Sequence, residues 1–251
     1  MPEQPPVYLI LGARGAQRRA IVADLIAGYF DEGEPVEVAL PAGEDDASDG
    51  IAALRKRATT GVVFVEAIED LPAPQLPLFI LPPGDASPAD GVEAFANWLR
   101  RHRIAPTRLL TVIHCRLQVE DPEVMTPWHR ACVHFSDAVL LNRREGLAPT
   151  ALQEFLAYFE KERYPCPIEL VKKGRVPNPA LVLEPEPRRM SLMFDADLEA
   201  VDFLEIDEDN LPEEPIDLKR PTDPYLERDQ AGQRLKPLPD ISRLLDPEER
   251  D

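Results

Sequence analysis

A short segment near the N-terminus combines two glycines and two arginines in a spacing that suits anion binding. Gly12 and Gly15 follow the apolar run Val7–Leu11, and Arg18 directly precedes a helix-like run that begins at Arg19. Glycine lets a loop turn tightly and lets a phosphate approach the backbone. The N-terminus of the following helix adds free N–H groups and a positive dipole end. The spacing therefore predicts a phosphate-binding loop, and a turn that uses glycine only for its geometry is the simpler alternative.

Three positions of this loop depart from the pattern that nucleoside triphosphate chemistry needs. A complete loop continues with Gly-Lys-Ser/Thr, in which the lysine contacts the β- and γ-phosphates and the hydroxyl binds Mg²⁺. This chain has Gln17, Arg18 and Arg19 at those positions. Arginine is a planar fork rather than a compact point charge, and at the hydroxyl position it repels a cation. We therefore expect Mg²⁺ to bind poorly, and hydrolysis of a bound nucleotide to be absent or very slow.

A second group of residues has the chemistry of metal ligands. His114 and Cys115 lie at the end of a strand-like run, while His129 and Cys132 lie three residues apart in a helix-like run. That spacing places His129 and Cys132 on one face of a helix. Mixed histidine and cysteine ligands suit Zn²⁺, so these four residues are candidate metal ligands. Their spacing matches no recognised zinc pattern, and Cys132 fits the core side of a helix equally well.

Strand-like and helix-like runs alternate through residues 1–183. The strand-like runs are Val7–Leu11, Val36–Leu40, Val62–Glu66, Leu78–Leu81, Leu109–His114, Ala138–Asn142 and Ile168–Val171. The helix-like runs are Arg19–Tyr29, Ile51–Ala58, Pro88–His102, Pro122–Phe135 and Pro149–Arg163. This alternation predicts an α/β fold, a three-layer sandwich around a mostly parallel sheet. Ligands of such sheets bind at the carboxyl ends of the strands, where the glycine loop lies.

Together, the segments that follow the strands resemble the CobW-like family of P-loop GTPases, which are often metal-insertion proteins. That family opens with a loop of the form G-F-L-G-A-G-K-T-T, and "GARGAQRRA" matches it in register at Gly12, Gly15 and Ala16. An apolar strand ending in Glu comes next in the family, and "VVFVEAIEDLPAP" supplies Glu66 as the candidate catalytic or metal-binding carboxylate. The resemblance spans Val7 to Val171 and implies a P-loop-type sheet, GTP as ligand and a metallochaperone role.

The guanine-reading segment of that family also has a counterpart in this chain. The family pattern Q-x-x-x-A-D-x-h-x-L-N-K-x-D is echoed by "ACVHFSDAVLLNRRE", in which Asn142 stands for Asn, Arg143 for Lys and Glu145 for the guanine-reading Asp. The nucleotide-binding residues implied by the resemblance are Gly12, Gly15, Arg18, Arg19, Asn142, Arg143 and Glu145. Glu145 is one methylene longer than Asp, and a misplaced polar partner can cost orders of magnitude in discrimination. Metal-handling relatives carry a Cys-rich motif where residues 27–61 here contain no cysteine.

Three functions follow from these observations. The first is a degenerate CobW-like domain, a pseudo-GTPase that acts by binding. The second is a working GTP-dependent metal chaperone with unusual loop chemistry. The third is an NAD(P)-binding oxidoreductase, although a GxxGxxG dinucleotide loop would need glycine at Arg18. Tyr158 is also followed four residues later by Glu162, where a Tyr-x-x-x-Lys catalytic pair needs lysine.

The composition of the chain limits its partners. Its 251 residues carry a formal net charge of −18, which argues against binding to nucleic acid or to an anionic membrane, because both need a basic surface. Three cysteines form no even disulfide framework and indicate a reducing, cytoplasmic setting. We expect neither a signal peptide nor a membrane-spanning segment, because no apolar run is long enough.

Residues 184–251 differ in composition from the rest of the chain. They hold 21 acidic and 9 basic side chains, which is −12 of the total charge, and nine prolines. Such a composition predicts a mostly disordered acidic tail after a P-loop GTPase-like domain at residues 1–183. Phe194, Leu198, Val201 and Leu204 have helical spacing, so this part could dock as a short helix on a protein partner. The alternative is that it lies on its own domain.

Overall fold

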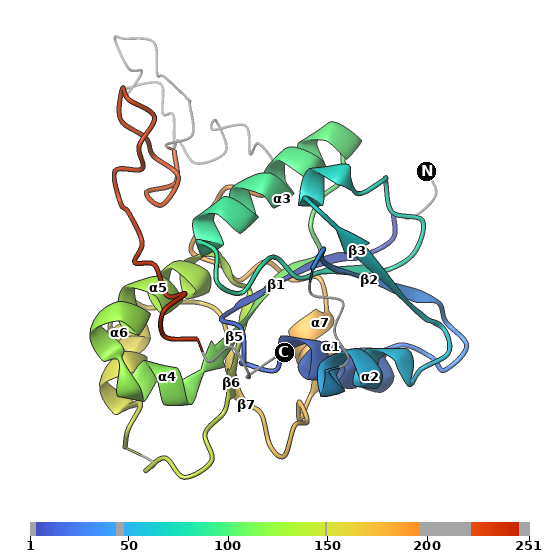
Figure 1. Cartoon of the computed structure of the whole chain (residues 1–251), viewed down its shortest axis with the longest axis horizontal. Coiled ribbons are helices and arrows are strands. Elements are labelled where there is room, and N and C mark those ends of the chain that lie inside the picture. The colour runs from blue at the N-terminus through green and yellow to red at the C-terminus, as the bar shows by residue number, and fades with distance from the viewer. Residues whose placement is uncertain (1–3, 44–47, 149, 196–221, 246–251) are drawn as a thin grey trace, which may run out of the picture.

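The computed structural model describes residues 4–43, 48–148, 150–195 and 222–245. Seven parallel strands form one sheet in the order β3-β2-β4-β1-β5-β6-β7 (Figure 1). The strands are β1 (Val7–Gly12), β2 (Val36–Pro41), β3 (Thr60–Val65), β4 (Leu78–Ile80), β5 (Arg108–His114), β6 (Ala138–Asn142) and β7 (Ile168–Leu170). Each strand-like run of the sequence overlaps one of them, so the predicted parallel sheet is confirmed.

Helices cover both faces of the sheet. On one side lie α1 (Arg18–Tyr29), α2 (Asp49–Arg55) and α7 (Pro179–Leu183). On the other side lie α3 (Pro88–His102), α5 (Pro122–Phe135) and α6 (Gln153–Lys161). A 3₁₀ turn, η1 (Ile68–Asp70), and the short helix α4 (Cys115–Glu120) complete the order of elements. The three-layer α/β sandwich predicted from the sequence is therefore confirmed.

The helix predictions are most accurate where the sequence carries start signals. Helices α3 and α5 begin with Pro88 and Pro122, whose fixed φ suits the first helical turn, and both match their predicted ranges. Helix α2 begins earlier than expected, because the Oγ of Ser48 accepts the backbone N–H of Ile51 as an N-cap. Helix α6 begins at Gln153, later than predicted. The sequence analysis missed α4 and α7, which have six and five residues.

The central strand β1 is buried on both faces, which explains its uninterrupted apolar sequence. Val7, Leu9 and Leu11 contribute to the core beneath α3 and α5, while Tyr8 and Ile10 contribute to the core beneath α1 and α2. Alternate residues of a strand point to opposite faces, so a strand covered on both sides needs apolar residues at every position. This arrangement fixes the position of the loop that follows β1.

The described parts of the predicted tail pack against the domain. Tyr225, Ile241 and Leu245 are buried and join the core beneath α3 and α5, and Phe194 packs against the same core. The folded body therefore extends beyond residue 183, the boundary predicted from the sequence. Residues 196–221 and 246–251 lie outside the described residues, and so does the expected docking helix from Leu198 onward.

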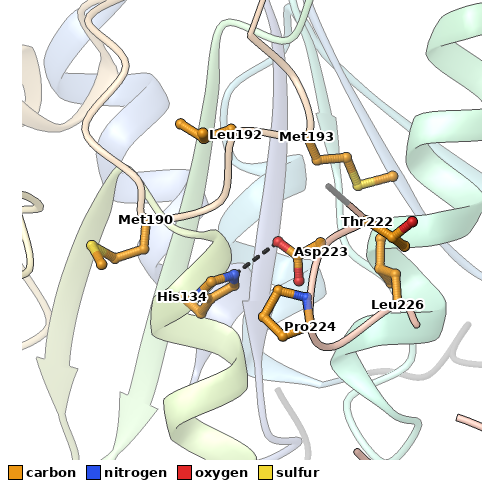
Figure 2. Close-up of a pocket in the computed structure, with 8 residues that line it drawn as sticks. All are labelled: His134, Met190, Leu192, Met193, Thr222, Asp223, Pro224 and Leu226. Carbon is orange, nitrogen blue, oxygen red and sulfur yellow. Dashed lines mark hydrogen bonds and ion pairs between the residues drawn. The ribbon is translucent and has the colours of Figure 1, made fainter. Parts of the chain in front are cut away.

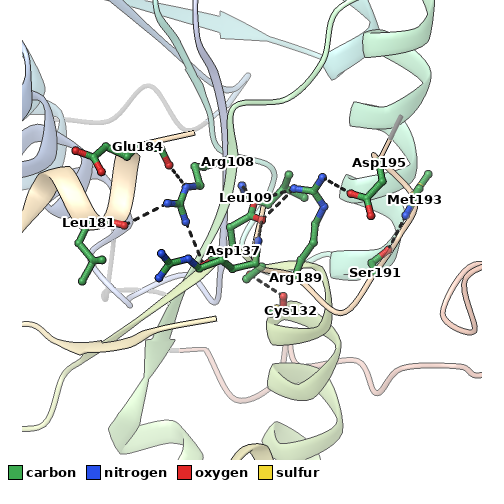
Figure 3. Close-up of polar contacts among 12 residues, drawn as sticks. Arg108, Leu109, Cys132, Asp137, Leu181, Glu184, Arg189, Ser191, Met193 and Asp195 are labelled. Carbon is green, nitrogen blue, oxygen red and sulfur yellow. Dashed lines mark hydrogen bonds and ion pairs between the residues drawn. The ribbon is translucent and has the colours of Figure 1, made fainter. Parts of the chain in front are cut away.

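A buried ion pair holds the beginning of this C-terminal segment to the amino ends of β5 and β6 (Figure 3). The Nη1 of Arg189 lies 3.0 Å from each carboxylate oxygen of Asp137. The same carboxylate accepts the backbone N–H groups of Leu109 and Arg188, both at 2.8 Å. Arg108 adds hydrogen bonds to the backbone carbonyls of Leu181 and Glu184. We call Asp137, Arg189 and Arg108 the amino-end clamp.

Candidate functional site

The loop between β1 and α1 has the backbone geometry that its glycines allow. Gly12 has φ of 142° and Gly15 has φ of 81°, and Gln17 is a non-glycine residue at φ of 65°. A Cβ added at Gly12 would lie 2.5 Å from the carbonyl oxygen of Val112 on β5. Glycine is therefore required where the loop leaves β1, both for its φ and for the close approach of β5.

The side chain of Arg18 turns into the protein at the start of α1. It is 1% exposed, and its Nη1 donates a hydrogen bond to the carbonyl oxygen of Pro82 at 2.7 Å. Its Cδ lies 3.2 Å from where a Cβ on Gly12 would be, and its Nη2 lies 2.6 Å from where a Cβ on Gly84 would be. Arg18 therefore passes between the end of β1 and the segment that follows β4.

Residues 82–85 form the second side of this site. The backbone N–H of Arg14 donates to the carbonyl oxygen of Gly84 at 3.0 Å, and the Arg14 guanidinium lies 3.7 Å from the Asp85 carboxylate. The sequence analysis did not assign this segment to the site. The available signal was a Pro-Pro-Gly run directly after a buried strand, but the sequence did not show that β4 lies beside β1.

Two of the predicted nucleotide-binding residues contact the loop from β6. The Nδ2 of Asn142 donates to the carbonyl oxygen of Ala16 at 2.8 Å and to the Oε1 of Gln17 at 3.1 Å. The Nε of Arg143 donates to the carbonyl oxygen of Gly15 at 2.9 Å. The structure thus brings Asn142 and Arg143 to the glycine loop, where they hold its backbone in place.

The remaining members of the predicted nucleotide site lie in different surroundings. Arg19 is 2% exposed, and its Nη1 donates to the Oγ of Ser48 at 3.1 Å, just before α2. Glu145 is exposed, and its backbone carbonyl lies 3.5 Å from the guanidinium of Arg116. Arg19 therefore joins the loop to α2, whereas Glu145 lies on the surface beyond β6.

Glu66 does not lie at the loop. It is exposed and follows β3, the edge strand, and both β2 and β4 separate β3 from β1. The sequence analysis placed it at the site because an apolar strand ending in Glu resembles the family pattern. Order along the chain does not determine order in the sheet, and the strand that adjoins β1 on this side is β4.

The predicted metal ligands have structural roles. The Nδ1 of His114 accepts the backbone N–H of Leu117 at the start of α4, and the Nδ1 of His129 lies 2.8 Å from the Oε1 of Gln118. Burial, together with the nearby His114, lowers the pKa of His129 to about 3. Burial raises the pKa of the Cys115 thiol to about 12 and that of Cys132 well above its ordinary value.

These contacts favour structural roles for His114, Cys115, His129 and Cys132, the four predicted zinc ligands. Among the described residues, no group of three or more histidine, cysteine or acidic side chains is arranged to hold a metal ion. A spacing of three residues on a helix brings His129 and Cys132 to one face, but that face is packed into the core, where both side chains are fully buried. Each of these side chains fits as a buried residue of the core.

A separate cavity of about 390 Å³ lies between α5 and the C-terminal segments (Figure 2). The Nε2 of His134 lies 2.8 Å from the Oδ2 of Asp223, and the Oγ of Ser191 donates to the same oxygen at 2.6 Å. In a nucleophilic triad the histidine lies between the hydroxyl and the carboxylate. Here the carboxylate lies between the other two, so the group anchors residue 223 rather than activating Ser191.

The sheet and the glycine loop together define the fold class. A glycine loop joins a central parallel strand to a helix at the carboxyl edge of a seven-stranded parallel sheet, which is an α/β fold of the P-loop type. The dinucleotide-binding alternative is not favoured. A dinucleotide loop needs glycine at this position so that the helix can pack closely on the strand, and here the position holds the side chain of Arg18. In the part of the chain that the structure describes, no helix could cross a membrane.

Comparison with known proteins gives matches among solved structures only. No protein-family model and no curated protein sequence matches the chain. The chain is similar to the cell division protein FtsY of Thermotoga maritima, at 19% identity and a TM-score of 0.46 over 73% of this chain and 68% of that one. It is similar to the signal recognition particle receptor FtsY of Elizabethkingia anophelis, at 14% identity and a TM-score of 0.47 over 72% and 65%. It is also similar to the Zn(II)-bound YjiA GTPase of E. coli, at 14% identity and a TM-score of 0.36 over 74% and 67%.

Proposed function

We propose that this chain is a degenerate, CobW-like P-loop protein that acts by binding a partner and hydrolyses GTP weakly or not at all. The path of the Arg18 side chain carries the proposal. The lysine of a working loop projects toward the β- and γ-phosphates. The Arg18 guanidinium instead reaches the carbonyl oxygen of Pro82 and holds the loop against the segment after β4. The positive charge of Arg18 therefore holds the loop closed against the segment after β4.

Two further positions support the loss of Mg²⁺-dependent chemistry. Phosphoryl transfer relies on a positioned Mg²⁺ and on fixed cations around the phosphates. Arg19 replaces the hydroxyl that would bind Mg²⁺, and it donates to Ser48 instead. Glu66, the candidate catalytic carboxylate, follows the edge strand β3 and is separated from β1 by two strands. The residues around the loop therefore favour binding over hydrolysis.

Isothermal titration with GTP, GDP and ATP, with and without Mg²⁺, tests this proposal. We expect the native chain to show no Mg²⁺-dependent binding. The variant Gln17→Gly, Arg18→Lys, Arg19→Thr restores the loop chemistry and should bind Mg²⁺-GTP at least tenfold more tightly. Arg14→Lys is the matched control, because it changes an arginine of the same loop without rebuilding the phosphate site.

The runner-up function is an active GTP-dependent metal chaperone. It would be supported by Mg²⁺-dependent GTP turnover in the native chain that Arg18→Ala or Glu66→Gln abolishes, and that result would overturn the pseudo-GTPase proposal. An inactive native chain together with binding by the restored variant would support the degenerate loop. The two proposals therefore predict opposite results for GTP turnover by the native chain.

The acidic C-terminal region indicates what kind of partner to expect. Residues 184–251 carry a net charge of −12, and a charged surface of one sign attracts and orients a partner of the opposite sign. We therefore propose a protein partner with a basic docking surface, bound through the acidic region. Binding of this kind weakens as the salt concentration rises, which a titration at two ionic strengths would show.

A further inference from the structure

Strand β3 is an open edge of the sheet. Within the described part of the chain it pairs with β2 alone, and Figure 1 shows it beside β2 at the end of the sheet. Its six residues, "TGVVFV", contain no proline and no charge. Exposed edge strands are templates for pairing with another chain, and proteins protect them with charges, proline, bulges or short length. Strand β3 has no charge, proline or short length to protect it.

The opposite edge of the sheet is protected. Strand β7 has three residues, Ile168–Leu170, and its central residue is Glu169. A three-residue strand offers few free backbone groups, and a charge at its centre opposes pairing with an apolar strand. The two edges of one sheet therefore differ, and only the β3 edge is suited to accept another strand.

The backbone of β3 presents hydrogen-bonding groups outward. The carbonyl oxygens of Thr59 and Val65 accept N–H groups of the β2 chain segment, so the odd-numbered residues of β3 face β2. Successive residues of a strand point their N–H and C=O groups to opposite edges. Val62 and Phe64 therefore point their N–H and C=O groups away from the sheet, toward an incoming strand.

Charges flank β3 in a pattern that selects the orientation of its partner. Arg55, Lys56 and Arg57 precede the strand, and Glu66, Glu69 and Asp70 follow it. A second β3 in parallel orientation would bring basic ends together and acidic ends together. In antiparallel orientation, the basic end of one strand meets the acidic end of the other, which is the favourable arrangement. The charges therefore favour a second copy of this chain in antiparallel orientation.

We propose that a second copy of this chain pairs with β3 in antiparallel orientation, about a two-fold axis at Val63. In this register Val62 lies opposite the partner's Phe64, and the outward N–H and C=O groups of both residues are used. An aromatic residue facing a β-branched residue is a favourable cross-strand pair. Lys56 then aligns in sequence with the partner's Asp70. The two sheets become one, and the interface is isologous, as a two-fold dimer requires.

Sedimentation of the full chain over about 1 to 200 µM tests the proposal, because that range brackets a weak edge-to-edge dimer. We expect a reversible dimer in the native chain. Val62→Pro removes an outward N–H that β2 does not use, and it should weaken dimerisation at least tenfold. Val62→Ala is the matched control, because it shortens the same side chain and keeps the N–H. A native chain that stays monomeric, or a Val62→Pro dimer as tight as the control, would overturn the proposal.

Charge reversal gives a second test that does not depend on proline. One variant carries Lys56→Glu with Arg57→Glu, so both ends of its β3 are acidic. The other carries Glu66→Lys with Asp70→Lys, so both ends are basic. Each should dimerise at least tenfold more weakly than the native chain at low salt, while an equimolar mixture should form a heterodimer. A mixture no tighter than the separate variants would contradict antiparallel β3 pairing.

Discussion

The two ends of the sheet both bury arginine, but they use it differently. At the amino end, Arg189 pairs with Asp137, whose carboxylate also accepts two backbone N–H groups (Figure 3). At the carboxyl end, Arg18 crosses from the glycine loop to the carbonyl oxygen of Pro82. The first arrangement satisfies a buried carboxylate and holds a distant segment of chain. The second lies at the carboxyl edge, which is where parallel sheets bind ligands.

The largest expected effect is at the amino end. Asp137→Ala leaves the buried guanidinium of Arg189 without its carboxylate and should cost about 3–5 kcal/mol of unfolding free energy. Urea unfolding at pH 7 measures this loss. Glu160→Ala, at an exposed position of α6, is the control and should change the free energy by less than about 0.5 kcal/mol. If the two variants were equally stable, the amino-end clamp would not be a stabilising feature.

The next effect is at the carboxyl end. Gly84→Ala places a Cβ 2.5 Å from the Arg14 backbone nitrogen and 2.6 Å from the Nη2 of Arg18. Such overpacking should cost about 1–3 kcal/mol. Combining it with Arg18→Ala relieves the contact with the guanidinium and leaves the contact with the Arg14 backbone. A double-mutant cycle should therefore give a coupling energy above about 0.5 kcal/mol, and strict additivity would show that Arg18 does not fill this space.

A smaller effect concerns the anchor of the C-terminal segment. Burial of the Asp223 carboxyl would raise its pKa, but hydrogen bonds from His134 and Ser191 outweigh burial and hold the pKa below the ordinary 3.8. Because the folded-state pKa is depressed, the stabilisation is present above pH 4 or so and is lost as pH falls through the folded pKa. Asp223→Asn should cost about 1–2 kcal/mol at pH 7.

The same unfolding measurement at low pH separates the charge of Asp223 from its shape. The difference between the native chain and Asp223→Asn should shrink as the pH falls from the ordinary pKa of 3.8 toward the lower folded pKa of this carboxyl. A difference that stays constant from pH 7 to pH 3 would mean that the ionised carboxylate is not what anchors the segment.

The last prediction concerns the reactivity of the buried cysteines and not the free energy of unfolding. Burial raises the pKa of Cys115 to about 12 and that of Cys166 to about 11, so little thiolate forms at pH 8. Alkylation of the folded chain should be at least a hundredfold slower than that of the urea-unfolded chain, as mass spectrometry can follow. Rapid labelling of Cys115, directly after β5, would show that the carboxyl end of the sheet opens more readily than its packing indicates.

The sequence predicted the sheet better than the site. Strands covered on both faces leave continuous apolar runs, which is why all the strands of the described sheet were found. The glycine loop was recognised because glycine is specific to tight turns, and Asn142 because its segment resembles the guanine-reading segment of a known family. The direction of the Arg18 side chain was not predictable, because it depends on β4 lying beside β1. Glu66 was misplaced for the same reason.

The C-terminal segment was difficult for a different reason. Its composition is acidic and rich in proline, which predicts disorder. The few residues that anchor the segment to the domain are too few to change that composition. Tyr225 and Leu226 form an apolar pair between Asp223 and Glu227, which is too short a run to predict a helix or a strand. Arg189 pairs with Asp137, which lies more than fifty residues earlier in the sequence. No local sequence pattern predicts an ion pair between residues so far apart.

The burial of Tyr225, Ile241 and Leu245 beneath α3 and α5 has a consequence for synthesis on the ribosome. The strands and helices up to α7 emerge first, while the residues that complete the core on that face emerge later. Until then, Phe135, whose ring lies 5.8 Å from the ring of Tyr225, lacks part of its native cover. A nascent chain stalled before residue 222 should therefore present this face to chaperones, whereas a chain in which Leu245 has emerged can close it.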